Sequence, residues 1–225
     1  MKKRIVVLAI AAVAALHNLF AQNQFQTEYL IGTSHGVTMS SVTLIPKVKQ
    51  DMLYGYNGGL FFRLISEKYF GFQVELNYAM RGWKEAMENT PQYAYSRTMN
   101  YLEIPFLTHI YFGNKVRGFI NLGPKIGMFI SEKEKMNFDP QQITEINIKN
   151  QYHKSTQTKF DYGICGGAGV ELCTKIGHFG VEGRYYYGLA DFFKTGSTSD
   201  FGTASMQVIS VNMTYAFSFH RKNKH

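Results

Sequence analysis

Apolar and polar residues alternate along most of the chain. Between Tyr69 and Arg81, every second residue from Phe70 to Met80 is apolar, and the residues between them are small or polar. A period of two places neighbouring side chains on opposite faces of a β-strand, and a helix does not give this pattern. The alternation therefore predicts a strand here and an all-β fold if it recurs.

The alternation does recur, and we expect about eight strands. Most of them reach the ~9–11 residues that a tilted strand needs to cross a membrane. The clear segments are Tyr69–Arg81, Met99–Phe112, Val116–Ile130, Phe160–Leu172, Phe179–Tyr187 and Ile209–Phe219, and two weaker ones lie near Tyr29–Val37 and Tyr56–Leu64.

The connections alternate between short and long. Short turns with long outer loops are typical of outer-membrane barrels. One face of each strand carries aliphatic and aromatic residues, and the other carries charged residues, Asn and many Gly. We therefore predict an eight-stranded antiparallel up-and-down transmembrane β-barrel; a soluble lipocalin-like barrel or a β-sandwich is the alternative. The short connections lie near residues 66–68, 113–115 and 175–177, and the long ones near 39–53, 82–95, 131–155 and 190–204.

The N-terminus has the pattern of an export signal. Basic residues at positions 2–4 precede the apolar segment Ile5–Leu16, and small Ala21 is followed by polar residues. This order is typical of a secretory signal peptide, and the apolar segment is too short to span a membrane. We expect a signal peptide over residues 1–21, one barrel domain over 22–225 and a location in the outer membrane.

Composition adds little to this prediction. The 225 residues carry a formal net charge of +8, with 15% aromatic and 18% charged side chains. No Lys- or Arg-rich block stands out, so we expect no nucleic-acid partner. The expected contact is outer-membrane lipid.

Charged residues gather on the predicted inward face. We interpret them as a neutralised plug that fills the bore, because buried charges must be paired, and so we expect no open pore. A proton or ion path, or acid–base chemistry, is the alternative. The predicted interior network consists of Arg63, Glu75, Glu103, Arg117, Lys125, Glu171, Glu182 and Arg184, with Arg81 on the same face.

The short turns predict which inward residues face each other. The turn near 175–177 places Glu182 opposite Gly169 and leaves room for Arg184 beside another glycine, Gly167. The turn near 113–115 places Glu103 opposite Lys125.

Pro105 interrupts a strong strand. A proline cannot donate a hydrogen bond to the neighbouring strand, so we expect a β-bulge at this position.

Candidate catalytic and metal-binding residues are sparse. Ser34 and His35 are adjacent and must point to opposite faces, which makes them a poor nucleophile and base. Cys165 and Cys173 lie too far apart on one strand for a disulfide and are interpreted as bore-filling side chains. We expect no catalytic residue, metal or cofactor. The histidines that follow the leader show no ligand-like spacing: His35, His109, His153, His178, His220 and His225.

Aromatic residues gather at one end of the second predicted hairpin. Trp and Tyr concentrate at membrane–water interfaces, so we interpret this group as an interface belt; a partner-docking patch on an outer loop is the alternative. The group consists of Tyr78, Trp83, Tyr93, Tyr95 and Tyr101.

Four segments of the chain are distinctive: Gly71-Phe72-Gln73-Val74-Glu75-Leu76-Asn77-Tyr78 followed by Arg81-Gly82, Tyr101-Leu102-Glu103-Ile104-Pro105-Phe106-Leu107, Asn121-Leu122-Gly123-Pro124-Lys125-Ile126-Gly127, and the glycine cluster from Gly163 to Glu171. In these segments the chain resembles the PorT-type family of outer-membrane β-barrel proteins. The most specific block is Leu102-Glu103-Ile104-Pro105. The chain departs from a usual barrel ending, since six residues follow the last apolar residue, Phe219.

The resemblance implies a part in type IX protein secretion, with components of that system as partners. Our first hypothesis is therefore a non-enzymatic, monomeric barrel that assists secretion across the outer membrane. The second is a small structural or adhesive barrel with a role similar to that of OmpX. A lipid-modifying enzyme and a narrow channel are the remaining alternatives.

Overall fold

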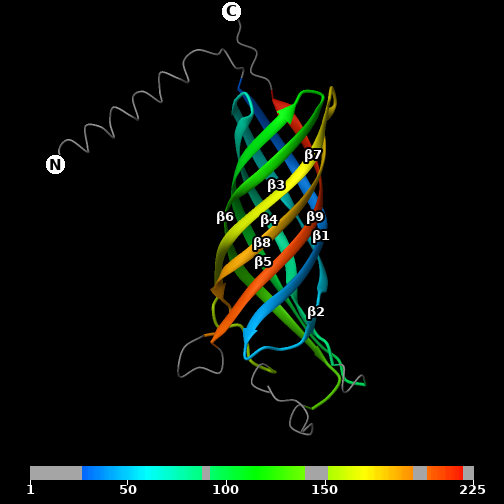
Figure 1. Ribbon diagram of the computed structural model, residues 1–225, viewed down its shortest axis with the longest axis vertical. Coiled ribbons are helices and arrows are strands. Elements are labelled where there is room, and N and C mark those ends of the chain that lie inside the picture. Colours follow the sequence, from blue (N-terminus) through cyan, green and yellow to red (C-terminus); the bar gives the residue numbers. More distant parts are fainter. Residues whose placement is uncertain (1–26, 88–91, 140–151, 195–201, 220–225) are drawn as a thin grey trace, which may run out of the picture.

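The computed structural model describes residues 27–87, 92–139, 152–194 and 202–219, and the predicted signal peptide lies outside them. The described chain forms one closed tube of long, tilted strands (Figure 1). Within these ranges, no helix has the length and apolar character needed to cross a membrane.

Eight long strands form the wall, and each is antiparallel to its neighbours. Pairing between the first and last strands closes the ring. This confirms the predicted eight-stranded up-and-down barrel. The strands are β1 (Glu28–Ile45), β3 (Leu53–Glu67), β4 (Phe70–Glu85), β5 (Tyr95–Gly113), β6 (Val116–Met136), β7 (Phe160–Thr174), β8 (Gly177–Asp191) and β9 (Thr203–Phe219), and a two-residue β2 (Gln50–Asp51) pairs with the end of β4.

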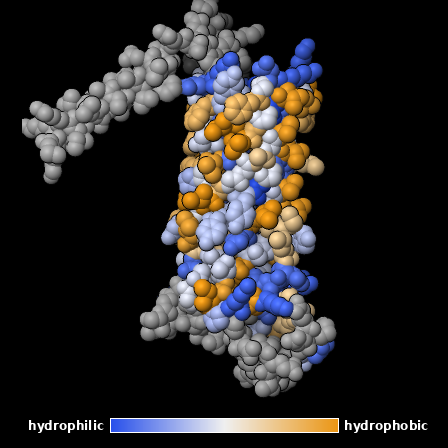
Figure 2. All heavy atoms as spheres, viewed as in Figure 1, coloured by the Kyte–Doolittle hydropathy of each residue, from blue (hydrophilic) through white to orange (hydrophobic). Residues whose placement is uncertain are grey.

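The outward face of the wall is apolar. Ile120, Leu122 and Ile164 expose 50%, 56% and 53% of their surface, and similar side chains surround the barrel. Figure 2 shows hydrophobic side chains along the visible wall and hydrophilic ones concentrated toward its two ends. Such a band is stable against lipid and costly in water, which excludes the lipocalin-like and sandwich alternatives.

The short turns lie at the end of the barrel where β1 begins and β9 ends (Figure 1). They connect β3 to β4, β5 to β6 and β7 to β8. Gly113 (φ 107°) and Gly177 (φ 141°) adopt backbone angles at two of these turns that other residues rarely adopt. Short turns mark the periplasmic end of such barrels, so the longer connections lie on the outer side.

The strands run further toward the outer end than the alternation predicts. β1 continues past Val37 to Ile45, and β9 begins at Thr203 rather than near Ile209. The difference has a physical reason: near this end, apolar Val42 and Leu44 point into the bore and are buried. The inward face is therefore no longer polar, and the pattern that identifies the strand is lost.

The predicted register of the β7–β8 hairpin is confirmed. Gly169 pairs with Glu182, and Gly167 pairs with Arg184. The β5–β6 register is displaced by two residues from the prediction, because Glu103 lies opposite Gly127 rather than Lys125.

The prediction of a β-bulge at Pro105 is wrong. Pro105 lies in register opposite Lys125, and the irregularity of this strand pair falls between Asn100 and Tyr101. The pairing of β4 with β5 keeps one register on both sides of the proline, from Val74–Phe106 to Asn77–Glu103. The strand thus tolerates the missing N–H group without inserting an extra residue.

Candidate functional site

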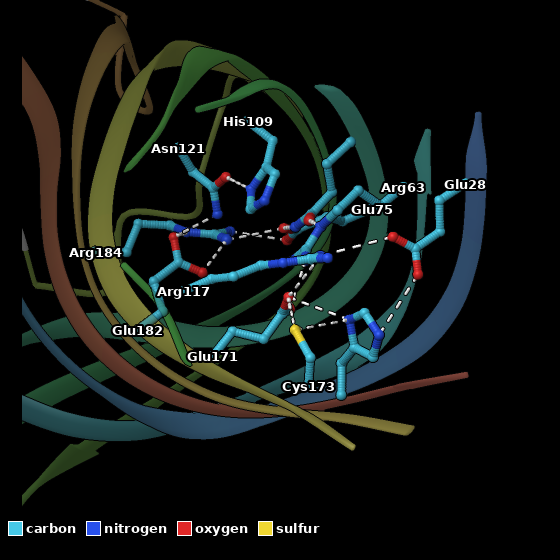
Figure 3. Close-up of polar contacts among 12 residues, drawn as sticks. Glu28, Arg63, Glu75, His109, Arg117, Asn121, Glu171, Cys173, Glu182 and Arg184 are labelled. Carbon is cyan, nitrogen blue, oxygen red and sulfur yellow. Dashed lines mark hydrogen bonds and ion pairs between the residues drawn. The ribbon is translucent and has the colours of Figure 1, made fainter. Parts of the chain in front are cut away.

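Buried charged and polar side chains line the bore, and a cluster around Arg184 occupies its middle. The Arg184 guanidinium donates to both carboxylate oxygens of Glu75, each at 2.8 Å, and reaches Glu182 at 2.8 Å. Figure 3 shows Arg184 extending across the bore from β8 toward Glu75 on β4. Gly167 makes room for this arrangement, since a Cβ there would lie 2.5 Å from Glu182 Oε1.

A second cluster lies beside it, nearer the outer end. Lys125 Nζ donates to Glu103 at 2.7 Å, although these residues are diagonal rather than opposite neighbours. Arg81 lies 3.2 Å from Glu103 and donates to Asp161 at 2.5 Å. The predicted network did not include Asp161, although its inward position on β7 has the same parity as Glu171.

A third cluster lies toward the periplasmic end. Arg63 Nη1 donates to Glu171 Oε2 at 2.6 Å. Arg117 lies 3.9 Å from the same carboxylate and 3.6 Å from Glu28, a residue that the sequence analysis did not identify. His178 Nδ1 lies 3.2 Å from Glu171. The structure thus brings all eight residues of the predicted network into the bore, in three clusters along its length.

The outer end of the bore is closed by aromatic side chains. Trp83 packs against Tyr95 and Phe192, with ring centroids 6.2 and 5.5 Å apart. Tyr152 packs edge-on against Tyr95 at 4.8 Å. Beside them, the guanidinium of Arg97 contacts Glu134.

The interpretation of the aromatic group as an interface belt is wrong for three of its members. Trp83, Tyr95 and Tyr101 are buried inside the bore, with exposures of 0%, 1% and 2%. Their parity places them inward together with the charged residues. Tyr78 does face outward, and Tyr93 lies before β5 and packs against Phe138.

These side chains fill the bore. At mid-height they leave a cavity of about 20 Å³ among Asn77, Arg81, Lys125 and Arg184. A cavity of this size has room for about one water molecule. The arrangement can hold charges in fixed pairs, but the cavity is far smaller than a path for a solute.

The candidate nucleophile and base, and the two cysteines, lie apart from each other. Ser34 is buried in the bore, whereas His35 is exposed on the outer face and contacts the Tyr56 hydroxyl at 2.7 Å. The two therefore do not form a nucleophile–base pair. Cys165 and Cys173 are both free thiols that point inward, the first at mid-bore and the second near the periplasmic turn.

Comparison with known proteins places this geometry in a family. The family model described as "Outer membrane protein beta-barrel domain" matches residues 20–194. The solved structure of OprG from Pseudomonas aeruginosa is 15% identical with a TM-score of 0.52, over 87% of this chain and 97% of that one. A search of curated proteins gives no match.

Two further solved structures show lower overall similarity. Ail of Yersinia pestis is 15% identical with a TM-score of 0.43, over 86% of this chain and 100% of that one. Neisserial surface protein A is 11% identical with a TM-score of 0.42, over 84% of this chain and 97% of that one. Since the family model covers more than three quarters of the chain, the protein belongs to the outer-membrane β-barrel domain family and is an outer-membrane protein.

Proposed function

We propose that the protein is a closed, monomeric, non-enzymatic barrel that acts through its two ends, as an accessory component of type IX protein secretion. The observation that carries the first part is the filled bore. Arg184 joins Glu75 and Glu182 across the lumen, and the mid-bore cavity of about 20 Å³ has room for little more than one water molecule. A barrel of this kind offers partners its outer loops and periplasmic turns.

The secretion role rests on the resemblance to PorT-type barrels. Deletion of the gene, followed by proteomics of the culture medium and the cell surface, tests it. We expect proteins with C-terminal sorting domains to disappear from both fractions and to accumulate in the periplasm. Expression of the wild-type chain from a plasmid should restore them. An unchanged secretome would contradict the secretion role.

A structural or adhesive barrel is the second candidate, and one observation favours it. The charged residues within the resembling segments all make ion pairs inside the bore: Glu75, Arg81, Glu103, Lys125 and Glu171. The needs of a filled barrel are therefore sufficient to explain those residues, whatever the barrel contacts. In this case, deletion should leave secretion intact and alter detergent sensitivity or surface attachment.

A lipid-modifying enzyme is a less favoured alternative. Ser34 and His35, the candidate nucleophile and base, lie on opposite faces of β1 and cannot act together. Under the proposed function, the mass spectrum of lipid A from the deletion strain should match that of the parent strain. A mass shift that the plasmid reverses would identify a lipid-modifying activity instead.

A further inference from the structure

Three side chains of metal-ligand type meet inside the periplasmic end of the barrel. Glu171 and Cys173 are two residues apart on β7 and both point inward. The tight turn after β7 brings the chain back, so that His178 on β8 pairs directly with Cys173. Figure 3 shows Glu171 and Cys173 side by side near the wall. Among the described residues, these three form a group whose ligand atoms all lie within 4.8 Å of one another.

The distances between these atoms fit a tetrahedral metal ion. Cys173 Sγ lies 3.8 Å from His178 Nδ1 and 3.8 Å from Glu171 Oε1. The Nδ1 and Oε1 atoms are 3.2 Å apart. Ligand atoms bound to zinc at ~2.0–2.3 Å in a tetrahedron lie ~3.3–3.7 Å from one another. The three atoms therefore outline one face of such a tetrahedron with little movement.

The surroundings orient two of the three ligands. Glu28 Oε1 lies 3.5 Å from His178 Nε2, on the far side of the ring from Nδ1. A carboxylate in this place favours a proton on Nε2 and leaves the Nδ1 lone pair for a metal, as in carboxylate–histidine–zinc arrangements. Arg63 holds Glu171 by Oε2, which leaves Oε1 facing the cysteine.

Two guanidinium groups lie near the place of the ion: Arg63, which holds Glu171 by Oε2, and Arg117. The Arg117 Nη1 atom lies 3.9 Å from Glu171 Oε1 and 3.6 Å from Glu28 Oε2. When a metal occupies Oε1, Glu28 still offers this guanidinium a carboxylate. Glu28, Glu171 and a Cys173 thiolate supply three negative charges, against the two guanidinium groups and the divalent ion.

We propose that Glu171, Cys173 and His178 form a site for a thiophilic divalent metal ion, with zinc as the best match. Thiolate, imidazole and carboxylate are the three ligand types that zinc takes in proteins. The Cys173 thiol releases its proton to water on binding, and a water molecule from the periplasmic side completes the tetrahedron. The histidine spacing considered in the sequence analysis did not reveal the site, because the ligands meet only across the β7–β8 turn.

Metal titration of the purified full-length protein, folded in detergent micelles under reducing conditions, tests the site. We expect one Zn²⁺ per chain, measured by competition with a chromophoric chelator. Co²⁺ should give a thiolate-to-cobalt charge-transfer band in the near ultraviolet. Cys173→Ser should abolish the band, and both Cys173→Ser and His178→Gln should weaken zinc binding by more than ~100-fold, beyond the range for residues outside the ligand set.

Cys165→Ser is the matched control, because Cys165 is the other cysteine and donates instead toward the Gly123 carbonyl at 3.6 Å. It should leave stoichiometry and affinity unchanged. Heat-modifiable gel mobility confirms that each variant is folded. The proposal is overturned if the folded wild type binds no zinc, if Cys173→Ser binds as the wild type does, or if Cys165→Ser loses binding equally.

Glu28→Gln tests whether a residue outside the ligand set orients His178. Loss of the carboxylate behind His178 should weaken zinc binding by roughly 10–100-fold while keeping the cobalt–thiolate band, since carboxylates that orient a ligand contribute about this much. Unchanged affinity in the folded variant would contradict the role of Glu28 in orienting His178.

Discussion

Arg184 shows how one residue holds the bore together. Its guanidinium contacts Glu75 on β4 and Glu182 on its own strand, and the side chain is about 10% exposed. Both carboxylates are buried, so water cannot stabilise their charge if Arg184 is removed. Removal of one partner of a buried ion pair costs more than the pair itself contributes, because a charge is left without compensation.

The substitution Arg184→Met tests this cost. We expect the free energy of unfolding to fall by about 3–5 kcal/mol, the usual cost of breaking a buried pair from one side. Denaturant titration in lipid vesicles, followed by gel mobility, measures it. Lys115→Met removes an exposed cation in the β5–β6 turn and should change stability by less than about 0.5 kcal/mol. Equal effects of the two variants would refute the account.

Trp83 is the only tryptophan and reports on which side of the wall it lies. Because it is fully buried in the bore, brominated lipids should quench its fluorescence only weakly. Tyr78→Trp in a Trp83→Phe background places the indole on the outer face, where the same lipids should quench it strongly. Strong quenching of the wild type would instead place Trp83 at the lipid interface and contradict its position in the bore.

In the β7–β8 hairpin, glycines make room for the large side chains of neighbouring residues. A Cβ at Gly167 would lie 2.5 Å from Glu182 Oε1 and 2.8 Å from the Gly183 carbonyl. A Cβ at Gly183, on the other face of the same hairpin, meets nothing within 4 Å. The two glycines therefore differ in what they leave room for.

Gly167→Val should destabilise the barrel by about 1–3 kcal/mol, because extra carbon atoms enter a filled interior. Gly183→Val should be nearly neutral or slightly stabilising, since it adds an apolar side chain to the outer wall. The same denaturant titration compares them. Similar losses for both variants would contradict bore packing as the source of the cost, since valine has the higher strand propensity at both positions.

Alternation predicted the middle of each strand and most of the inward charges, because one face there meets lipid and the other meets paired charges. It did not predict the strand ends, where Val42 and Leu44 turn apolar side chains inward. It also did not place Trp83 correctly, since aromatic character alone does not distinguish a belt from a packed bore. Contacts across the lumen, such as Arg63 with Glu171, depend on closure of the ring and have no local signal.

The filled bore predicts that the barrel as a whole does not conduct ions. Purified protein inserted into planar bilayers should show no stable conductance steps, because the mid-bore cavity of about 20 Å³ holds roughly one water molecule. Insertion is checked by protease protection in vesicles prepared in parallel. Reproducible steps from the folded protein would contradict the closed barrel and revive the narrow-channel hypothesis.

The ion pairs that span the lumen also constrain how the barrel is built. Arg63 and Glu75 come from β3 and β4, whereas their partners Glu171 and Arg184 come from β7 and β8, more than 100 residues later. A half-inserted chain that holds only the first hairpins keeps these charges uncompensated against lipid or water. Completion of the β7–β8 hairpin brings both partners at once, so we expect assembly to be cooperative and a chain that ends before β7 to insert poorly.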